Sequence, residues 1–173
     1  SKTLITTFYG KAAKYNYFAG CSNGGRMGFV AAQRYSHLFD GIAAGASIID
    51  FTSNSGLYGA WMVKHTLKSD GSKIFDSENV EKLRTEVIRQ CDELDGIKDS
   101  VISHPPACSL NYDALLCTTD NTQGCFEESQ VSHVKALYEG IKDKNGSPLF
   151  VGVPFGSELL WEFWFLGNEK HIG

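Results

Sequence analysis

Residues 20–24 read Gly-Cys-Ser-Asn-Gly and could supply a nucleophile for acyl transfer, because Ser22 lies in the pattern Gly-x-Ser-x-Gly. In a sharp turn from a strand to a helix, such a serine is pushed out of the backbone and its hydroxyl becomes accessible. The backbone N–H of Asn23 would then lie at a helix N-terminus, where it can stabilise a developing oxyanion. By itself the motif is a weak signal in a chain with 18 glycines, since a glycine-rich loop with a surface serine has the same letters.

The flanking residues predict the elements that such a turn requires. Residues 15–19 are apolar and aromatic and predict a strand, and residues 24–34 predict a helix. A second strand is predicted over residues 41–46, and a further helix over residues 3–14. The order strand, elbow, helix, strand implies that the two strands pair in parallel.

The segment around Ser22 resembles the nucleophile segment of the tannase and feruloyl esterase family of α/β-hydrolases, where the nucleophile lies in a Cys-Ser-x-Gly-Gly motif. The likeness is carried by residues 17–26, 32–35, 39–46 and 91–96, so it extends across most of the chain. It implies a carboxylic ester hydrolase that forms an acyl-serine at Ser22. The implied substrates are small esters of aromatic acids, such as ferulate or gallate, from plant cell walls or tannins.

A serine nucleophile needs a base, and the base needs an acid that orients it. In α/β-hydrolases the acid and then the histidine follow the serine. Each histidine after Ser22 is better explained as a solvated or structural residue; they are His37, His65, His104, His133 and His171. The resemblance puts the catalytic histidine directly before a cysteine, and no His-Cys dipeptide occurs here. We therefore expect an internal fragment that lacks the catalytic Asp and His and is inactive alone.

The five cysteines suggest an oxidising compartment. Four of them lie close together in the sequence and could form two disulfides in three ways. The family resemblance implies the pairs Cys91–Cys108 and Cys117–Cys125. It also implies that Cys21 pairs with the cysteine after the catalytic histidine, outside this fragment. The alternative for Cys21 is a buried apolar thiol.

Residues 92–101 carry aspartates at spacings of three and four after a helix predicted over residues 77–90. Carboxylates and free carbonyls in a tight loop are the ligands that Ca²⁺ prefers, although a solvated acidic turn has the same composition. The resemblance favours calcium, because the family binds it in the lid at an Asp-x-x-Asp-Gly-x-x-Asp segment. The implied ligands of this structural Ca²⁺ are the side chains of Asp92, Asp95 and Asp99 and the carbonyls of Ile97 and Val101.

The predicted fold class is α/β, with a partial α/β-hydrolase core over residues 1–50 and an inserted, disulfide-clasped lid over residues 51–173. Lids cover the substrate and exclude water. Helices are predicted in the lid over residues 54–67, 77–90 and 127–142, the last with His133 on an exposed, charged face. The aromatic segment at residues 150–165 either lines a pocket for the acyl group or packs in an ordinary core.

The net charge of −4 and the lack of a basic stripe argue against nucleic acid as a partner. No apolar run is long enough to span a membrane. The cysteines and the glycosylation sequence at residues 145–147, on a predicted hairpin turn, favour a secreted protein whose signal peptide lies outside this fragment. The alternative functions are a non-catalytic, truncated or degenerate homologue stabilised by calcium and, with less support, a serine peptidase of similar fold.

Overall fold

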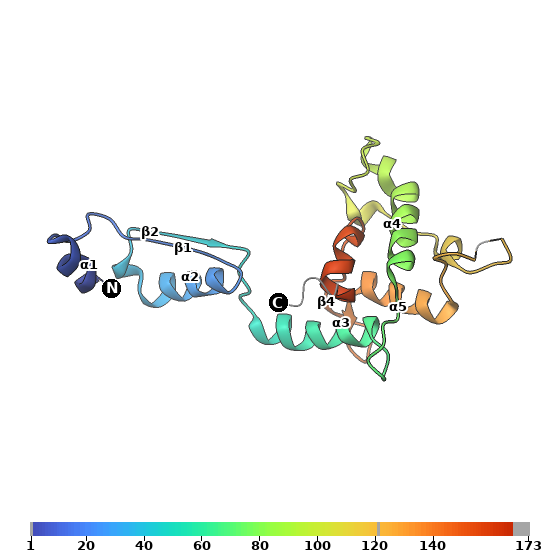
Figure 1. Cartoon of the computed structure of the whole chain (residues 1–173), viewed down its shortest axis with the longest axis horizontal. Coiled ribbons are helices and arrows are strands. Elements are labelled where there is room, and N and C mark those ends of the chain that lie inside the picture. Colours follow the sequence, from blue (N-terminus) through green and yellow to red (C-terminus); the bar gives the residue numbers. More distant parts are fainter. Residues whose placement is uncertain (1, 121, 168–173) are drawn as a thin grey trace. The chain divides into compact units, whose positions relative to one another are not determined.

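The computed structural model describes residues 2–120 and 122–167. The chain divides into two compact units, Ser1–Gly56 (unit 1) and Leu57–Gly173 (unit 2) (Figure 1). No described helix combines the length and the apolar character needed to cross a bilayer.

Unit 1 is a two-stranded parallel sheet with one helix packed on it. Its elements are α1 (Lys2–Tyr9), β1 (Tyr17–Cys21), α2 (Asn23–Arg34), the 3-10 turn η1 (Ser36–Leu38) and β2 (Gly41–Gly45). The strands pair in parallel from Tyr17 opposite Gly41 to Cys21 opposite Gly45. The predicted strand–elbow–helix–strand order and the parallel pairing are therefore confirmed.

Three boundaries in unit 1 differ from the prediction by two residues or more, one of them the end of β1, which lies at Cys21 instead of residue 19. The first helix ends at Tyr9 and does not continue to residue 14, because Gly10 adopts φ 67°, a left-handed conformation that stops a helix. The first strand begins at Tyr17, since Asn16 is held by Asp40 instead. Asn16 N donates to the Asp40 carboxylate at 2.7 Å, and Asp40 N donates to Asn16 O at 2.7 Å.

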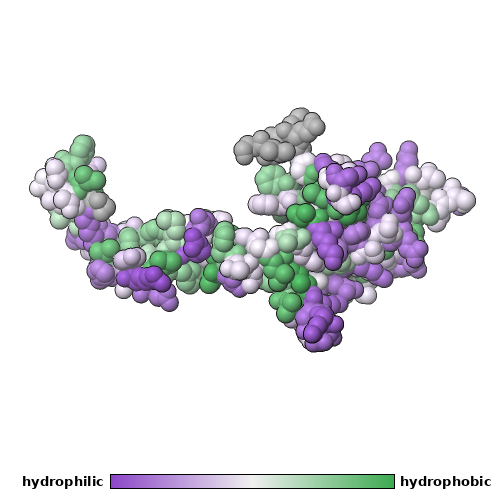
Figure 2. All heavy atoms as spheres, turned by 90° about the horizontal axis from the view of Figure 1, so that it is seen from below, coloured by the Kyte–Doolittle hydropathy of each residue, from purple (hydrophilic) through white to green (hydrophobic). Residues whose placement is uncertain are grey.

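Very little of unit 1 is buried. Among its described residues only Gly25, Gly28 and Ala31 are buried, all on one face of α2. Large apolar side chains such as Phe8 and Tyr17 are 82% and 71% exposed. Figure 2 shows hydrophobic residues at the surface along this part of the chain. Unit 1 therefore has local order without a core of its own.

Unit 2 is mostly helical. The π-helical turn η2 (Thr52–Leu57) leads into α3 (Tyr58–Thr66), α4 (Ser77–Cys91) and the short turns η3 (Asp92–Asp95), η4 (Pro105–Ala107) and η5 (Tyr112–Leu115). The remaining elements are α5 (Glu128–Glu139), the strands β3 (Ile141–Lys142) and β4 (Pro148–Phe150), the 3-10 turn η6 (Glu158–Leu160) and the π-helical turn η7 (Glu162–Leu166). β3 and β4 pair in antiparallel fashion.

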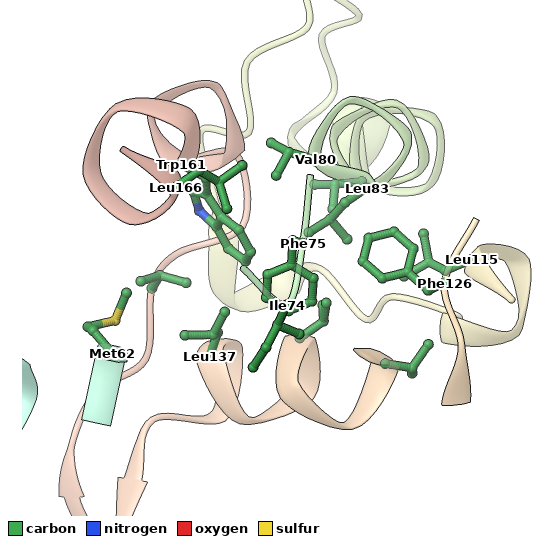
Figure 3. Packing of buried hydrophobic residues seen from close by; sticks show 14 of the residues in the cluster. Met62, Ile74, Phe75, Val80, Leu83, Leu115, Phe126, Leu137, Trp161 and Leu166 are labelled. Carbon is green, nitrogen blue, oxygen red and sulfur yellow. The ribbon is translucent and has the colours of Figure 1, made fainter. Parts of the chain in front are cut away.

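The core of unit 2 is built from apolar side chains of several helices (Figure 3). Leu83 and Val87 of α4 and Leu137 of α5 are at most 1% exposed, and Trp161 is 2% exposed. The start of α4 is set by a capping box. Asn79 N donates to the Asp76 carboxylate at 2.8 Å, and Asp76 N donates to the Asn79 side chain at 3.1 Å. Burial of this apolar surface is what holds unit 2 together.

The last predicted helix of unit 2 is too long. It ends at Glu139, because Gly140 has φ 80°, and Ile141 begins β3 instead of completing the helical face. No residue with a Cβ fits at Gly140, since a side chain would collide with the backbone of residues 150–152. A close backbone approach, which the helical periodicity does not report, therefore ends α5.

Two disulfides close loops in unit 2. Cys91 pairs with Cys108 and Cys117 pairs with Cys125, over sequence separations of 17 and 8. This is the pairing that the family resemblance implies. The first bond ties the end of α4 to the loop after η4, and the second lies beside the bridge between Leu116 and Phe126.

Candidate functional site

Ser22 occupies a strained turn between β1 and α2. Its backbone has φ 59° and ψ −118°, a region that residues with a side chain rarely adopt and that costs about 1–3 kcal/mol. The turn is held on both sides: Ser22 N donates to Gly45 O at 3.0 Å, and Ser22 O accepts from Arg26 N at 3.1 Å. Strain that is kept in this way by surrounding hydrogen bonds is typical of a functional site.

The Ser22 hydroxyl is exposed and is not used to cap α2. A serine at this position usually accepts a hydrogen bond from the second or third N–H of the helix, but the unusual φ and ψ turn the side chain away from that role. Asn23 is the first residue of α2. Its N–H therefore has no intrahelical acceptor and lies at the positive end of the helix dipole. A hydroxyl and a backbone N–H that could serve as nucleophile and oxyanion donor are thus adjacent in the chain.

Three glycines let the elbow close. A side-chain carbon at Gly20 would collide with the carbonyl of Gly24, and one at Gly25 would collide with the carbonyl of Gly45. At Gly28 it would lie 3.0 Å from the Ala44 Cβ, so this glycine permits α2 to approach β2. Gly24 itself has open space around a Cβ. The motif therefore needs its first glycine for the turn, and Gly25, outside the motif, for contact with β2.

Arg26 is a polar residue of the elbow that the sequence analysis did not single out. Its Nε donates to the Asn23 side-chain oxygen at 3.0 Å, and its guanidinium carbon lies 5.6 Å from the centre of the Phe51 ring. The spacing of three between Asn23 and Arg26 on a helix could have indicated this contact. The pair holds the Asn23 side chain and a positive charge on the first turn of α2.

Within the described part of unit 1 the structure places no base beside Ser22. His37 lies in η1 and is exposed, and no hydrogen bond between Ser22 and a histidine occurs in the described part of unit 1. His65, His104 and His133 belong to unit 2, and His171 lies outside the described residues. Cys21, beside the serine, is exposed and forms no disulfide within the chain.

His133 differs from its prediction. It was expected on an exposed face of the last helix, but it is half-buried, and its Nδ1 lies 3.0 Å from His65 Nδ1. The periodicity places Val131, Val134 and Leu137 on the buried face of α5, as predicted. His133 lies at the edge of that face, where α3 packs against α5.

The aspartates of the predicted calcium loop have different environments. Asp92 is 4% exposed, and its Oδ1 is buried without a hydrogen-bond partner. Asp95 accepts from Ile97 N and Ser103 N, both at 3.0 Å, and these hydrogen bonds lower the pKa of its carboxyl group. Asp99 accepts from Val101 N at 3.0 Å.

The donor set of this loop fits a hard cation in its chemistry, since carboxylate and carbonyl oxygens are the ligands of Ca²⁺. The unpartnered Asp92 oxygen is the observation that favours an ion, because a buried polar atom without a partner costs free energy. Over the described residues, however, no three His, Cys, Asp or Glu side chains are gathered as metal ligands. Asp95 and Asp99 instead bind the backbone of their own loop.

The aromatic segment at residues 150–165 was expected either to line a pocket for the acyl group or to pack in a core. Its residues are divided between buried and exposed positions. Trp161 is buried in the core, and Phe155 stacks on Tyr138 with ring centres 4.1 Å apart. Phe163 and Trp164 are 51% and 69% exposed. These last two are therefore the most exposed aromatic side chains of the segment.

Comparison with known proteins matches residues 1–170 to the family model for tannase and feruloyl esterase. The chain is 36% identical over 161 residues to a probable feruloyl esterase B-1 of Aspergillus oryzae, covering 91% of this chain and 30% of that protein. It is 34% identical over 168 residues to a protein of the same name from Aspergillus terreus, covering 92% and 31%. The chain thus spans about a third of the length of these relatives.

Solved structures show the same similarity. The crystal structure of feruloyl esterase B from Aspergillus oryzae superposes with a TM-score of 0.72 at 34% identity, covering 96% of this chain and 34% of that one. Tannin acyl hydrolase from Aspergillus niger superposes with a TM-score of 0.58 at 23% identity, covering 88% and 30%. The second similarity concerns the fold alone.

Proposed function

The chain belongs to the tannase and feruloyl esterase family, and from this premise we propose that it is the nucleophile-bearing part of a carboxylic ester hydrolase. The observation that carries the proposal is the strained, exposed Ser22 between β1 and α2, whose hydroxyl is not used as a helix cap. The family model for tannase and feruloyl esterase and the relatives named feruloyl esterase support esters of aromatic acids as the substrate class.

In the proposed reaction, the Ser22 hydroxyl loses its proton to a histidine base and attacks the ester carbonyl. The oxyanion that forms is stabilised by the Asn23 N–H at the start of α2. The alcohol leaves with a proton returned from the base, and water then releases the acid from Ser22. In this proposal the base and its acid come from the remainder of the protein, as the family resemblance implies.

We assign unit 2 the role of the lid in this enzyme. Its support is the independent core and the two disulfides of unit 2, since a lid must keep its shape while it covers the substrate. Ca²⁺ would be held in it by the side chains of Asp92, Asp95 and Asp99 and the carbonyls of Ile97 and Val101. The ion would satisfy the buried Asp92 oxygen, and its role would be structural.

Secretion is part of the proposal. It is supported by the two disulfides and by the exposed Asn145 of the sequence Asn-Gly-Ser, at a turn between β3 and β4. Asp143 holds this turn by accepting from Asn145 N and Ser147 N, both at 2.8 Å. N-glycosylation at Asn145 predicts a mass loss on enzymatic deglycosylation of the secreted protein, absent in Asn145→Gln.

The experiment that tests the catalytic proposal is labelling of the full-length protein with a fluorophosphonate probe, followed by hydrolysis of methyl ferulate and methyl gallate. Ser22→Ala is expected to abolish labelling and to lower kcat by roughly 10⁶-fold. Ser36→Ala, at an exposed serine of η1, serves as the control and should retain both. Absence of labelling in the unmodified full-length protein would refute the proposal in favour of a degenerate, non-catalytic homologue.

Calcium has its own test, which is independent of activity. Addition of a chelator to the 173-residue chain is expected to lower its melting temperature, and Ca²⁺ at 100 times its Kd should contribute about 2.7 kcal/mol. Asp92→Asn should remove this dependence on chelator. An equal melting temperature with and without chelator would show that the loop is a solvated acidic turn.

A further inference from the structure

The two histidines of unit 2 that face each other have no role in the proposed hydrolysis. His65 lies on α3 and His133 on α5, and their Nδ1 atoms are 3.0 Å apart. The ring centres are 5.2 Å apart, with the ring planes at 64°. Two ring nitrogens from separate helices are thus held close together at a packed helix–helix contact.

Partial burial and nearby positive charge favour the neutral form of both rings. Partial burial lowers the pKa of His65, and the electrostatic influence of His133 and Lys64 lowers it further. Burial likewise lowers the pKa of His133, together with the charge of Lys64. Trp61 covers one side of the pair, with its ring centre 5.7 Å from that of His65. Neutral imidazole is the form that binds metal ions.

We propose that His65 and His133 form a binding site for a divalent transition-metal ion, Cu²⁺ above all, through their two Nδ1 atoms. At metal–nitrogen distances of about 2.0–2.1 Å, two ligands at a right angle lie about 2.9 Å apart and two at the tetrahedral angle about 3.3 Å apart. The observed separation of 3.0 Å is closer to the first value. Square-planar or tetragonal nitrogen coordination is typical of Cu²⁺ and Ni²⁺.

Binding requires one change of tautomer and a small rotation of the rings. Without metal, one Nδ1–H donates to the other Nδ1. With metal, both Nδ1 lone pairs point to the ion, so the donating ring moves its proton to Nε2 and no net proton is released. Both rings must rotate about χ2, which is a broad torsion for histidine.

Solvent can complete the coordination sphere, because a hollow lies on each side of the pair. One is lined by residues that include His133, Leu67 and Gln130, and the other by residues that include His65, Trp61 and Lys64. In the described part of the chain no third His, Cys, Asp or Glu joins the two histidines. The remaining ligands are therefore water, and the charge of nearby Lys64 weakens binding of a cation.

The test is a Cu²⁺ titration of the 173-residue chain carrying Cys21→Ser, which removes the exposed thiol that would otherwise react with copper. Binding of one equivalent is expected, with a d–d absorption band and nitrogen hyperfine structure in the electron paramagnetic resonance spectrum. His65→Gln and His133→Gln should each weaken binding by at least about tenfold, as loss of a ligand exceeds loss of its outer-shell partner.

His104→Gln, in the loop before η4, is the matched control and should bind as the parent does. Tryptophan fluorescence reports whether each variant is folded, since all three tryptophans lie in unit 2. If folded His65→Gln and His133→Gln variants bind Cu²⁺ with the affinity and the spectrum of the parent, the proposal is wrong. It is equally wrong if the parent binds no stoichiometric Cu²⁺.

Discussion

Unit 1 and unit 2 differ in what holds them together. Unit 1 has a strained, well-defined backbone conformation at Ser22, but among its described residues only residues 25, 28 and 31 are buried. Unit 2 has a core of apolar side chains and two disulfides. The comparison teaches that the backbone geometry at Ser22 can be set within one strand–helix–strand segment, by glycines and a few backbone hydrogen bonds, without an apolar core. Stability instead requires apolar area removed from water, and that is contributed here by unit 2.

The sharpest test of local encoding compares two neighbouring glycines. In the full-length protein, Gly25→Ala should lower kcat at least about 10²–10³-fold, because its Cβ collides with Gly45 O and displaces the Ser22 elbow. Gly24→Ala, where a Cβ meets nothing, should retain activity. The measurement is the rate of fluorophosphonate labelling. Equal losses in both variants would mean that the elbow is not built as described.

A substitution in each unit tests where stability resides. Leu137→Ala, at a side chain with 0% exposure, should destabilise unit 2 by roughly 2–5 kcal/mol. Phe29→Ala of α2, at 48% exposure, should have little effect on the same 173-residue chain. Urea denaturation followed by tryptophan fluorescence measures both. A comparable loss for Phe29→Ala would contradict the assignment of the stability to unit 2.

The disulfides should contribute less to the stability of unit 2 than its apolar core does. Replacing Cys91 and Cys108 by serine should cost about 3 kcal/mol, because the bond closes a loop with a separation of 17 residues in the unfolded chain. The shorter loop from Cys117 to Cys125 should cost somewhat less, about 2.5 kcal/mol. In the full-length protein, these cysteine variants should have a lower melting temperature, whereas the rate of fluorophosphonate labelling at Ser22 should change little.

The smallest effect concerns a buried carboxyl group of unit 2. Burial raises the pKa of Glu158, although Tyr138 Oη donates to it at 2.6 Å and Gly156 N at 3.0 Å. The pKa of Glu158 in the folded protein lies above its unfolded value of 4.5. The stability that protonated Glu158 contributes is therefore complete below pH 4.5. It is lost as the pH rises through the folded pKa.

Glu158→Gln should remove that pH dependence. The free energy of unfolding of the parent should fall relative to the variant between pH 4.5 and neutral pH, as measured by urea denaturation at several pH values. Glu81→Gln, at an exposed glutamate of the same charge, is the control. A parent and variant with parallel pH profiles would show that the buried carboxyl group does not titrate in this range.

Much of unit 1 could be predicted because its signals are local. The apolar and aromatic run before the elbow, the glycines beside Ser22 and the position of Asn23 at the start of a helix all act within a few residues. The bounds that failed, after Tyr9 and before Tyr17, depend on a positive φ at Gly10 and on contact with Asp40. The first is a local signal that the sequence analysis missed, since glycine commonly ends a helix, whereas the second joins residues 24 positions apart.

By itself the sequence determined the strand–elbow–helix order and, through its family resemblance, the two cysteine pairs, and it singled out Ser22 as the candidate nucleophile. Tertiary structure alone decided that Gly25 and not Gly24 is tightly packed, that Gly140 ends α5, and that His133 meets His65. The reason is physical: propensity and motif spacing act along the chain, whereas close approach and burial depend on segments that only folding brings together.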